Sequence, residues 1–259
     1  MKKILVSALM AAMVITSCKK DDTICYNNVT MGNIEGETIV SDQGNTFDIV
    51  EAMYDVSLEK FEYGRVILSC DVLRKSAENR YDIRLTGIQS VLTKETIKAS
   101  TITPESEAAV NDPIIINELW YGGGYINMLI HFAHKQGSTG KHLINLVHDD
   151  TETSADGTKN YTFILRHNAF GETPTEENHL GFDPSLGYVS FPIAGLIEGD
   201  KAKITIKWNT HPMISFGAFD YLNSEEVSRT YDWERTGYQQ NASTTTRPTL
   251  KQSKCFSVR

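Results

Sequence analysis

Histidine is the residue type in this chain with the widest chemical use, because an imidazole ring can bind a metal ion or carry a proton. Seven histidines are present. His131 and His134 are three residues apart in an apolar stretch, which places their rings on opposite faces of a strand and prevents them from chelating one ion. No histidine is followed by glutamate, so the H-E-x-x-H motif is absent. We expect no metal centre, and a site assembled across several strands is the alternative.

Nucleophilic chemistry has no better support in the sequence. There is no G-x-S-x-G turn around a serine, and no two cysteines have the C-x-x-C spacing of zinc and redox sites. We therefore expect a protein that is not an enzyme, with no catalytic residues and no cofactor.

Residues 149–157 form an acidic, oxygen-rich segment that could hold calcium. The segment lacks the glutamate that an EF-hand loop carries at its twelfth position. Asp156 and Gly157 are a favoured turn pair, so a solvated hairpin loop is the better interpretation.

Aromatic residues flank three consecutive glycines at residues 120–125. The glycines allow a sharp turn between two apolar strands, and the lysine of a phosphate-binding loop is missing. Trp120, Tyr121 and Tyr125 could stack on a sugar or a peptide, and they are our candidate ligand-binding residues. Packing of these rings into the end of the fold is the alternative.

Alternating apolar and polar residues place these motifs on strands. The alternation is clearest at 81–86 and 203–208, and further strands are expected at 126–132, 143–147, 162–165 and 188–193. Strands 114–119 and 125–133 are apolar on both faces, which is typical of the centre of a sandwich. A helical period is arguable only at 48–58. The pattern predicts an all-β protein.

A polar segment with two prolines, residues 101–113, separates two groups of strands. The group at 38–103 has the size of a small OB-like barrel. The group at 113–211 has the strand spacing of an antiparallel β-sandwich. Beyond His211 the pattern dissolves, and we expect 212–259 to be a C-terminal extension without a stable fold.

The chain begins with two lysines and an apolar stretch too short to span a bilayer. The stretch ends in Ile-Thr-Ser-Cys, which resembles a bacterial lipobox. We therefore expect residues 1–17 to be a signal peptide, Cys18 to carry lipid, and 18–37 to be a tether. The charged residues 19–22 resemble the surface-export signal of Bacteroides-type lipoproteins, which predicts an outer-membrane protein exposed at the cell surface.

Three further cysteines remain. Cys70 alternates with Val66 and Leu68 along a strand, so we expect an inert thiol in the core. Cys25 and Cys255 could pair or stay free. The net charge of -8 argues against a nucleic-acid partner, because binding phosphates requires clustered lysine and arginine.

An ordered set of motifs runs through the second half of the chain: Asp112-Pro113-Ile114, residues 120–127, His142 to Val147, Leu165 to Ala169 and Val189 to Ile193. Together with the lipobox and the strand that starts Gly64-Arg65-Val66, this set resembles the NigD-like lipoproteins over about residues 1–211. The resemblance implies an OB-like N-terminal domain and a β-sandwich C-terminal domain. It also implies a protective role, because the family is named after a bacteriocin operon.

We expect a lipid-anchored envelope protein that binds an envelope protein or a secreted toxin. The alternative is an accessory glycan-binding lipoprotein of an outer-membrane uptake system.

Overall fold

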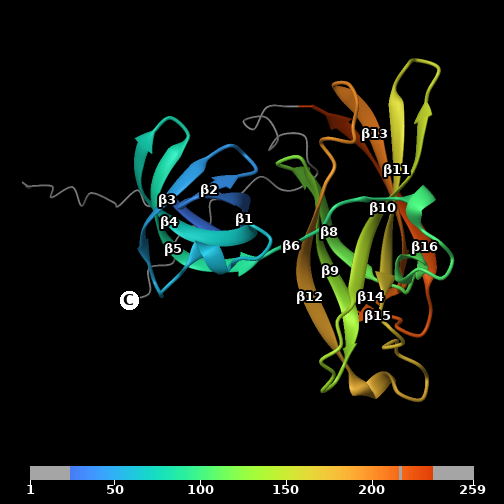
Figure 1. Cartoon of the computed structure of the whole chain (residues 1–259). Coiled ribbons are helices and arrows are strands. Elements are labelled where there is room, and N and C mark those ends of the chain that lie inside the picture. Colours follow the sequence, from blue (N-terminus) through green and yellow to red (C-terminus); the bar gives the residue numbers. More distant parts are fainter. Residues whose placement is uncertain (1–23, 216–217, 236–259) are drawn as a thin grey trace, which may run out of the picture.

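Five strands near the N-terminus close into a small barrel in the order β1-β2-β3-β5-β4 (Figure 1). The computed structural model describes residues 24–215 and 218–235, with the side chains of 24–29 left undescribed. The strands are β1 (Ile24–Glu35), β2 (Thr38–Ser41), β3 (Thr46–Ala52), β4 (Arg65–Ala77) and β5 (Arg80–Ser90). β3 and β5 pair in parallel, and the other neighbours pair antiparallel.

The barrel closes because alternate residues of each strand are apolar and point inward. Ile83 and Leu85 of β5 are fully buried, whereas the side chain of Arg84 between them is 42% exposed. The interior is filled by Ile39, Phe47, Val66, Leu68, Cys70, Val72, Ile83 and Leu85. The expected small OB-like barrel is therefore confirmed.

Two sheets packed face to face follow the barrel (Figure 1). The first has the order β16 (Glu225–Glu234), β13 (Lys201–Thr210), β11 (Lys159–Asn168), β10 (Leu143–Thr153) and β7 (Ile97–Lys98). The second has the order β6 (Leu92–Thr93), β12 (Phe182–Pro192), β9 (Tyr125–Lys135) and β8 (Ile115–Gly122). The expected sandwich is confirmed, and three of its pairs, β7–β10, β11–β13 and β6–β12, are parallel.

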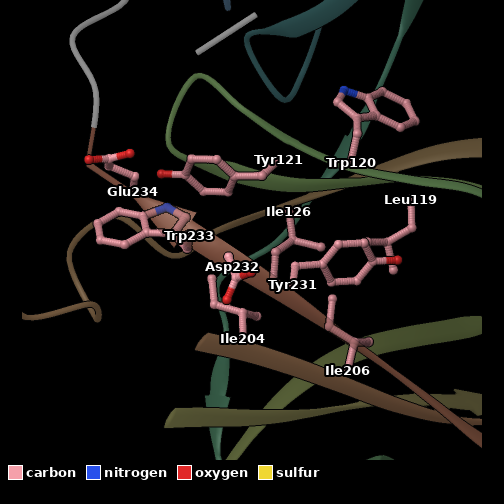
Figure 2. Close-up of a pocket in the computed structure, with 10 residues that line it drawn as sticks. All are labelled: Leu119, Trp120, Tyr121, Ile126, Ile204, Ile206, Tyr231, Asp232, Trp233 and Glu234. Carbon is pink, nitrogen blue, oxygen red and sulfur yellow. The ribbon is translucent and has the colours of Figure 1, made fainter. Parts of the chain in front are cut away.

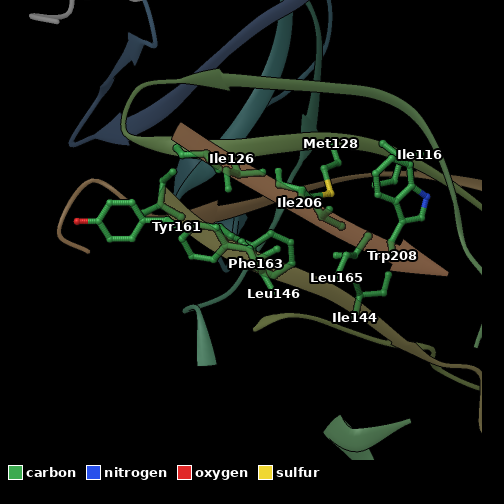
Figure 3. Close-up of a cluster of buried hydrophobic side chains, with 14 of the residues drawn as sticks. Ile116, Ile126, Met128, Ile144, Leu146, Tyr161, Phe163, Leu165, Ile206 and Trp208 are labelled. Carbon is green, nitrogen blue, oxygen red and sulfur yellow. The ribbon is translucent and has the colours of Figure 1, made fainter. Parts of the chain in front are cut away.

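The sandwich core lies between the inner faces of these sheets (Figure 3). Ile126, Met128 and Ile130 of β9 point into it from one sheet, and Phe163 and Leu165 of β11 from the other. All five side chains are at most 2% exposed. Burying a side chain of this size contributes about 1.5–3 kcal/mol, so the core is the main source of the domain's stability.

The outer face of the β8–β9–β12 sheet is also covered, in two places. One end packs against the barrel through an apolar cluster of Met31, Ile67, Val91, Trp120 and Tyr188. The other end lies under a small hairpin, β14 (Met213–Ser215) and β15 (Ala218–Phe219), whose Phe219 ring packs on His131 with centroids 5.9 Å apart.

The chain passes from barrel to sandwich at Val91, which is fully buried. Its N–H donates to the Arg65 carbonyl at 3.0 Å, and three residues later the Lys94 N–H donates to the Ser190 carbonyl. The predicted boundary at 101–113 is therefore wrong. Residues 92–113 already lie along the sandwich, because β6 and β7 add to its two sheets.

Two other predicted boundaries are wrong. The tether expected at 18–37 ends earlier, because β1 pairs with both β2 and β4 and closes the barrel. The extension expected at 212–259 contains β14, β15 and β16, and β16 pairs with β13 along its whole length. The signal peptide and Cys18 lie outside the described residues, as do residues 236–259.

Local expectations had mixed outcomes. The segment 48–58 is not a helix: it holds the end of β3 and a loop that leads to a 3₁₀ turn, η1 (Leu58–Lys60). β8 is an edge strand and not a central one, and the second apolar face of this region is explained by the barrel packed against it. The hairpin expected at 149–157 is confirmed, but β10 runs to Thr153, so its loop is only 154–158, with Gly157 at φ 84°.

Cys70 is 1% exposed, and burial raises the pKa of its thiol to about 12. The expected inert core thiol is confirmed, since a thiol with that pKa carries almost no thiolate. Pairing of Cys25 with Cys255 lies outside the described residues. Within the part of the chain that the structure describes, no helix is long and apolar enough to cross a membrane.

Candidate functional site

The three aromatic residues singled out in the sequence lie on different sides of the β8–β9 hairpin. Trp120 is 6% exposed and packs edge-on against Tyr188 in the cluster between barrel and sandwich. Tyr121, the next residue, points to the opposite face of β8 and packs edge-on against Trp233, with centroids 5.8 Å apart (Figure 2). Tyr125 is half-buried, and its ring lies 4.0 Å from the guanidinium of Arg65.

Arg65 is the centre of a buried polar junction between the two domains. Its guanidinium donates two hydrogen bonds to the Asp42 carboxylate, at 2.9 and 2.8 Å. It also donates to Ser190 at 3.0 Å and to Asn127 at 2.8 Å, both on the sandwich. Arg65 is 1% exposed, so these bonds are made away from water, where each is stronger and where losing one is more costly.

The glycines of the hairpin allow this junction to close. Gly123 has φ 61°, and a Cβ on it would lie 2.8 Å from Cγ of Asp42 and nearer still to Oδ1. The expected sharp turn is confirmed. Its glycines allow Asp42 of the barrel to approach the β8–β9 hairpin of the sandwich closely. Sequence analysis missed Arg65 and Asp42 as partners, although an arginine that begins an apolar strand was a usable signal.

A narrow apolar pocket opens beside Tyr121, between the edge strands β8 and β16 (Figure 2). Tyr231, Trp233 and Ile204 complete its walls. Its volume is about 30 Å³. A small-ligand pocket needs about 300 Å³ or more, so this one has room only for water.

A larger cavity lies on the outer face of β9 and β12, under the β14–β15 hairpin. Its volume is about 420 Å³, within the range of small-ligand pockets. His131, Phe182, Ile214, Phe219 and Tyr221 are among the residues that line it. The β14–β15 hairpin that covers it lies at the end of the sandwich remote from the barrel (Figure 1).

Exposed apolar side chains line this cavity or are neighbours, in sequence or in strand pairing, of residues that line it. Five of them form what we call the far-end patch: Leu180, Leu186, Met213, Ile214 and Leu222. Their exposed fractions run from 46% to 84%. Grouped exposed apolar residues mark binding surfaces, whereas single ones are ordinary. Sequence analysis missed the patch, because its members come from separate segments.

Two histidines beside the cavity are held neutral. Burial lowers the pKa of His131, and the neighbouring His211 lowers it further. Burial also lowers the pKa of His211. The Tyr221 hydroxyl lies 3.1 Å from Nε2 of His131, and it can donate a hydrogen bond to that nitrogen only while the ring is neutral.

These shifts predict a loss of stability in mild acid. In the unfolded chain these two histidines take up protons near the ordinary histidine pKa of about 6.5, whereas in the folded chain they take them up only at lower pH. The free energy of unfolding is therefore expected to be highest above that pH and to fall as the pH drops below it. Urea denaturation at pH 7.5 and 5.5 measures the change. His131→Gln should reduce the difference in the free energy of unfolding between the two pH values, whereas His179→Gln, at an exposed position, should leave that difference unchanged. The contribution assigned to His131 would be refuted if the two variants showed the same difference.

One group among the described residues could hold a metal ion: His134, His142 and Glu172. The cluster lies at the same end of the sandwich, between the ends of β9, β10 and β11. His131 and His134 do separate, as their spacing predicted: the first faces the cavity and the second faces Glu172.

Comparison with known proteins identifies one domain of the chain. A model of the NigD-like C-terminal β-sandwich domain matches residues 96–214. This segment is a NigD-like C-terminal domain. No curated protein matches the chain.

Several solved structures resemble this NigD-like protein. A protein of unknown function from Bacteroides vulgatus is 17% identical, with a TM-score of 0.56 over 88% of this chain and 99% of that one. A NigD-like immunity protein from Bacteroides caccae is 16% identical, with a TM-score of 0.56 over 80% and 96%. A provisionally assigned lipoprotein from Bacteroides fragilis is 13% identical, with a TM-score of 0.50 over 79% and 96%. These likenesses show the shared fold.

The matched domain contains the cluster of His134, His142 and Glu172 and all of the far-end patch except Leu222. It ends before β16, so in this NigD-like protein the strand that closes one edge of the sandwich lies beyond the matched segment.

Proposed function

We propose that this NigD-like protein is a lipid-anchored envelope protein that binds another protein and catalyses no reaction. The far-end patch carries the proposal. It combines five exposed apolar side chains with a cavity of about 420 Å³ into which an anchoring side chain of a partner can fit. The three aromatic rings of the glycine hairpin are buried or half-buried, so they form no open platform for a sugar.

The position of the patch suits an anchored protein. Cys18, the proposed lipid-attachment residue, precedes β1 by six residues, which reach about 20 Å when extended. The barrel would then stand close to the membrane and hold the far end of the sandwich away from it. The likeness to a provisionally assigned lipoprotein of Bacteroides fragilis supports the anchor. The charged residues 19–22 support export to the outer surface.

The proposed partner is a secreted protein toxin, which the patch would sequester or block. The NigD-like immunity protein of Bacteroides caccae has the same fold, and this supports a protective role. An apolar patch with a central cavity is the kind of surface on which a few buried side chains carry most of the binding energy.

Substitution inside the patch tests the proposal. Ile214→Asp should lower capture of the partner at least tenfold, because a charge buried in an apolar interface costs more than about 1.4 kcal/mol. The mature, tagged protein is crosslinked on intact cells in the presence of secreted proteins, and retained proteins are quantified by mass spectrometry.

The matched control is Met53→Asp. Met53 and Ile214 are each 70% exposed, but Met53 lies on the barrel. A secreted protein that is retained by the wild type and by Met53→Asp, and lost with Ile214→Asp, supports the proposal. Equal retention by the two variants would overturn it.

A further inference from the structure

Two connections at the far end of the sandwich, β9–β10 and β11–β12, bring two histidines and a glutamate together. His134 lies near the end of β9, His142 directly before β10, and Glu172 in the loop after β11. Oε2 of Glu172 is 3.6 Å from Nδ1 of His134 and 3.7 Å from Nε2 of His142. The three atoms lie within 4.8 Å of one another.

The proton on His142 is fixed by a chain of hydrogen bonds. The Pro113 carbonyl can only accept, so Nδ1 of His167, 3.0 Å away, must carry a proton and donate it. With His167 neutral, its Nε2 accepts from Nδ1 of His142 at 2.8 Å. Nε2 of His142 is then unprotonated. His167 is 2% exposed and the His142 side chain 3%, and such burial disfavours the charged form of each ring.

His134 is fixed in the same way. Its Nε2 lies 3.1 Å from the carbonyl of Ser138 and must donate to it, which leaves Nδ1 with a free lone pair. That lone pair faces Glu172 at 3.6 Å.

Glu172 supplies the third electron pair. Its Oε1 accepts a hydrogen bond from Ser138, whose Oγ in turn accepts from the Gly140 N–H at 2.9 Å. A glutamate is ionised at neutral pH, so the group is a carboxylate. Oε2 of Glu172 and Nε2 of His142 are both buried without a hydrogen bond, and the His142 side chain is 3% exposed.

Two imidazole lone pairs and a carboxylate oxygen therefore converge with no hydrogen between them. While both rings are neutral, such an arrangement repels itself unless a proton or a metal cation enters its centre. We propose that Nδ1 of His134, Nε2 of His142 and Oε2 of Glu172 bind a zinc ion.

The geometry suits zinc. Bonds of about 2.0–2.1 Å in a tetrahedron place neighbouring ligand atoms about 3.3 Å apart, close to the observed 3.6 and 3.7 Å. Nitrogen and oxygen ligands are those that zinc accepts. His167 and Ser138 orient two of the ligands, as outer hydrogen-bond partners do in zinc sites.

The ion would have a structural consequence for the binding surface. Glu172 belongs to the loop 169–181, which also carries Leu180 of the far-end patch. Zinc would fasten this loop to the ends of β9 and β10. The metal site stands independently of the proposed function, because it depends on none of the patch residues.

Isothermal titration with zinc tests the site on the mature chain after chelator treatment. The wild type should bind one zinc ion per chain. Glu172→Gln and His134→Asn should each weaken binding at least tenfold. Their parent side chains are 20% and 27% exposed, and circular dichroism checks that both variants fold.

His179→Asn is the matched control, since His179 is an exposed histidine on the same loop. It should bind zinc as the wild type does. Hydrogen exchange supplies a second readout: zinc should slow exchange in residues 169–181 of the wild type and leave it unchanged in Glu172→Gln. The proposal is overturned if the wild type binds no zinc, or if folded Glu172→Gln and His134→Asn bind it as tightly as the wild type.

Discussion

Replacing Arg65 with methionine is expected to lower the free energy of unfolding by about 3–5 kcal/mol, the cost of removing one partner of a buried ion pair. Asp42 is 5% exposed, so its carboxylate would keep a charge without a counter-charge or water. Asn127 and Ser190 would lose a donor at the same time. Urea denaturation at pH 7, followed by tryptophan fluorescence, measures the loss.

Arg74→Met is the control for this prediction. Arg74 also pairs with an aspartate, Asp82, but its side chain is 73% exposed, and exposed pairs contribute about 0–1 kcal/mol. Asp42→Asn in the Arg65→Met background should recover part of the loss, because the neutral amide removes the unpaired charge. Similar losses for Arg65→Met and Arg74→Met would contradict the role assigned to the junction.

Gly123→Ala is expected to cost about 3 kcal/mol, from two causes. A non-glycine residue at φ 61° is strained by about 1–2 kcal/mol. The new methyl would also collide with Asp42, and forcing extra volume into a packed site costs about 1–3 kcal/mol. The same denaturation experiment measures the sum.

Gly157→Ala separates the two causes. Gly157 has φ 84°, but a Cβ there meets no atom within 4 Å. This variant should therefore lose only the conformational part, about 1–2 kcal/mol. If both substitutions cost the same, close approach of Asp42 to the hairpin contributes nothing measurable.

The strands with clean alternation were predictable, and the edges of each domain were not. Apolar and polar residues alternate in 81–86 and 203–208 because one face of each strand points into the core and the other points toward solvent. β16 (Glu225–Glu234) has a single buried residue, Trp233, and seven exposed ones. An edge strand needs few apolar residues, so its sequence reads like that of a loop.

The sites could be predicted even less, for a different physical reason. Trp120 was singled out as a contact for a ligand, and its hydrophobic surface is instead used within the chain. His134 and His142 flank the β9–β10 connection and Glu172 lies in the β11–β12 connection, and no sequence period indicates that these positions meet. Only the folded sheets bring these segments together, and only the hydrogen bonds to Pro113 and Ser138 reveal which nitrogen is unprotonated.

The buried crossing at Val91 has a consequence for resistance to proteolysis. Proteases cut extended, accessible chain, and two-domain proteins are usually severed at the linker between domains. In this protein the crossing is a single fully buried residue whose N–H donates to the Arg65 carbonyl, so a protease cannot bind this peptide until the junction between the domains opens. Under limited proteolysis we therefore expect exposed loops to be cut before the two domains are separated.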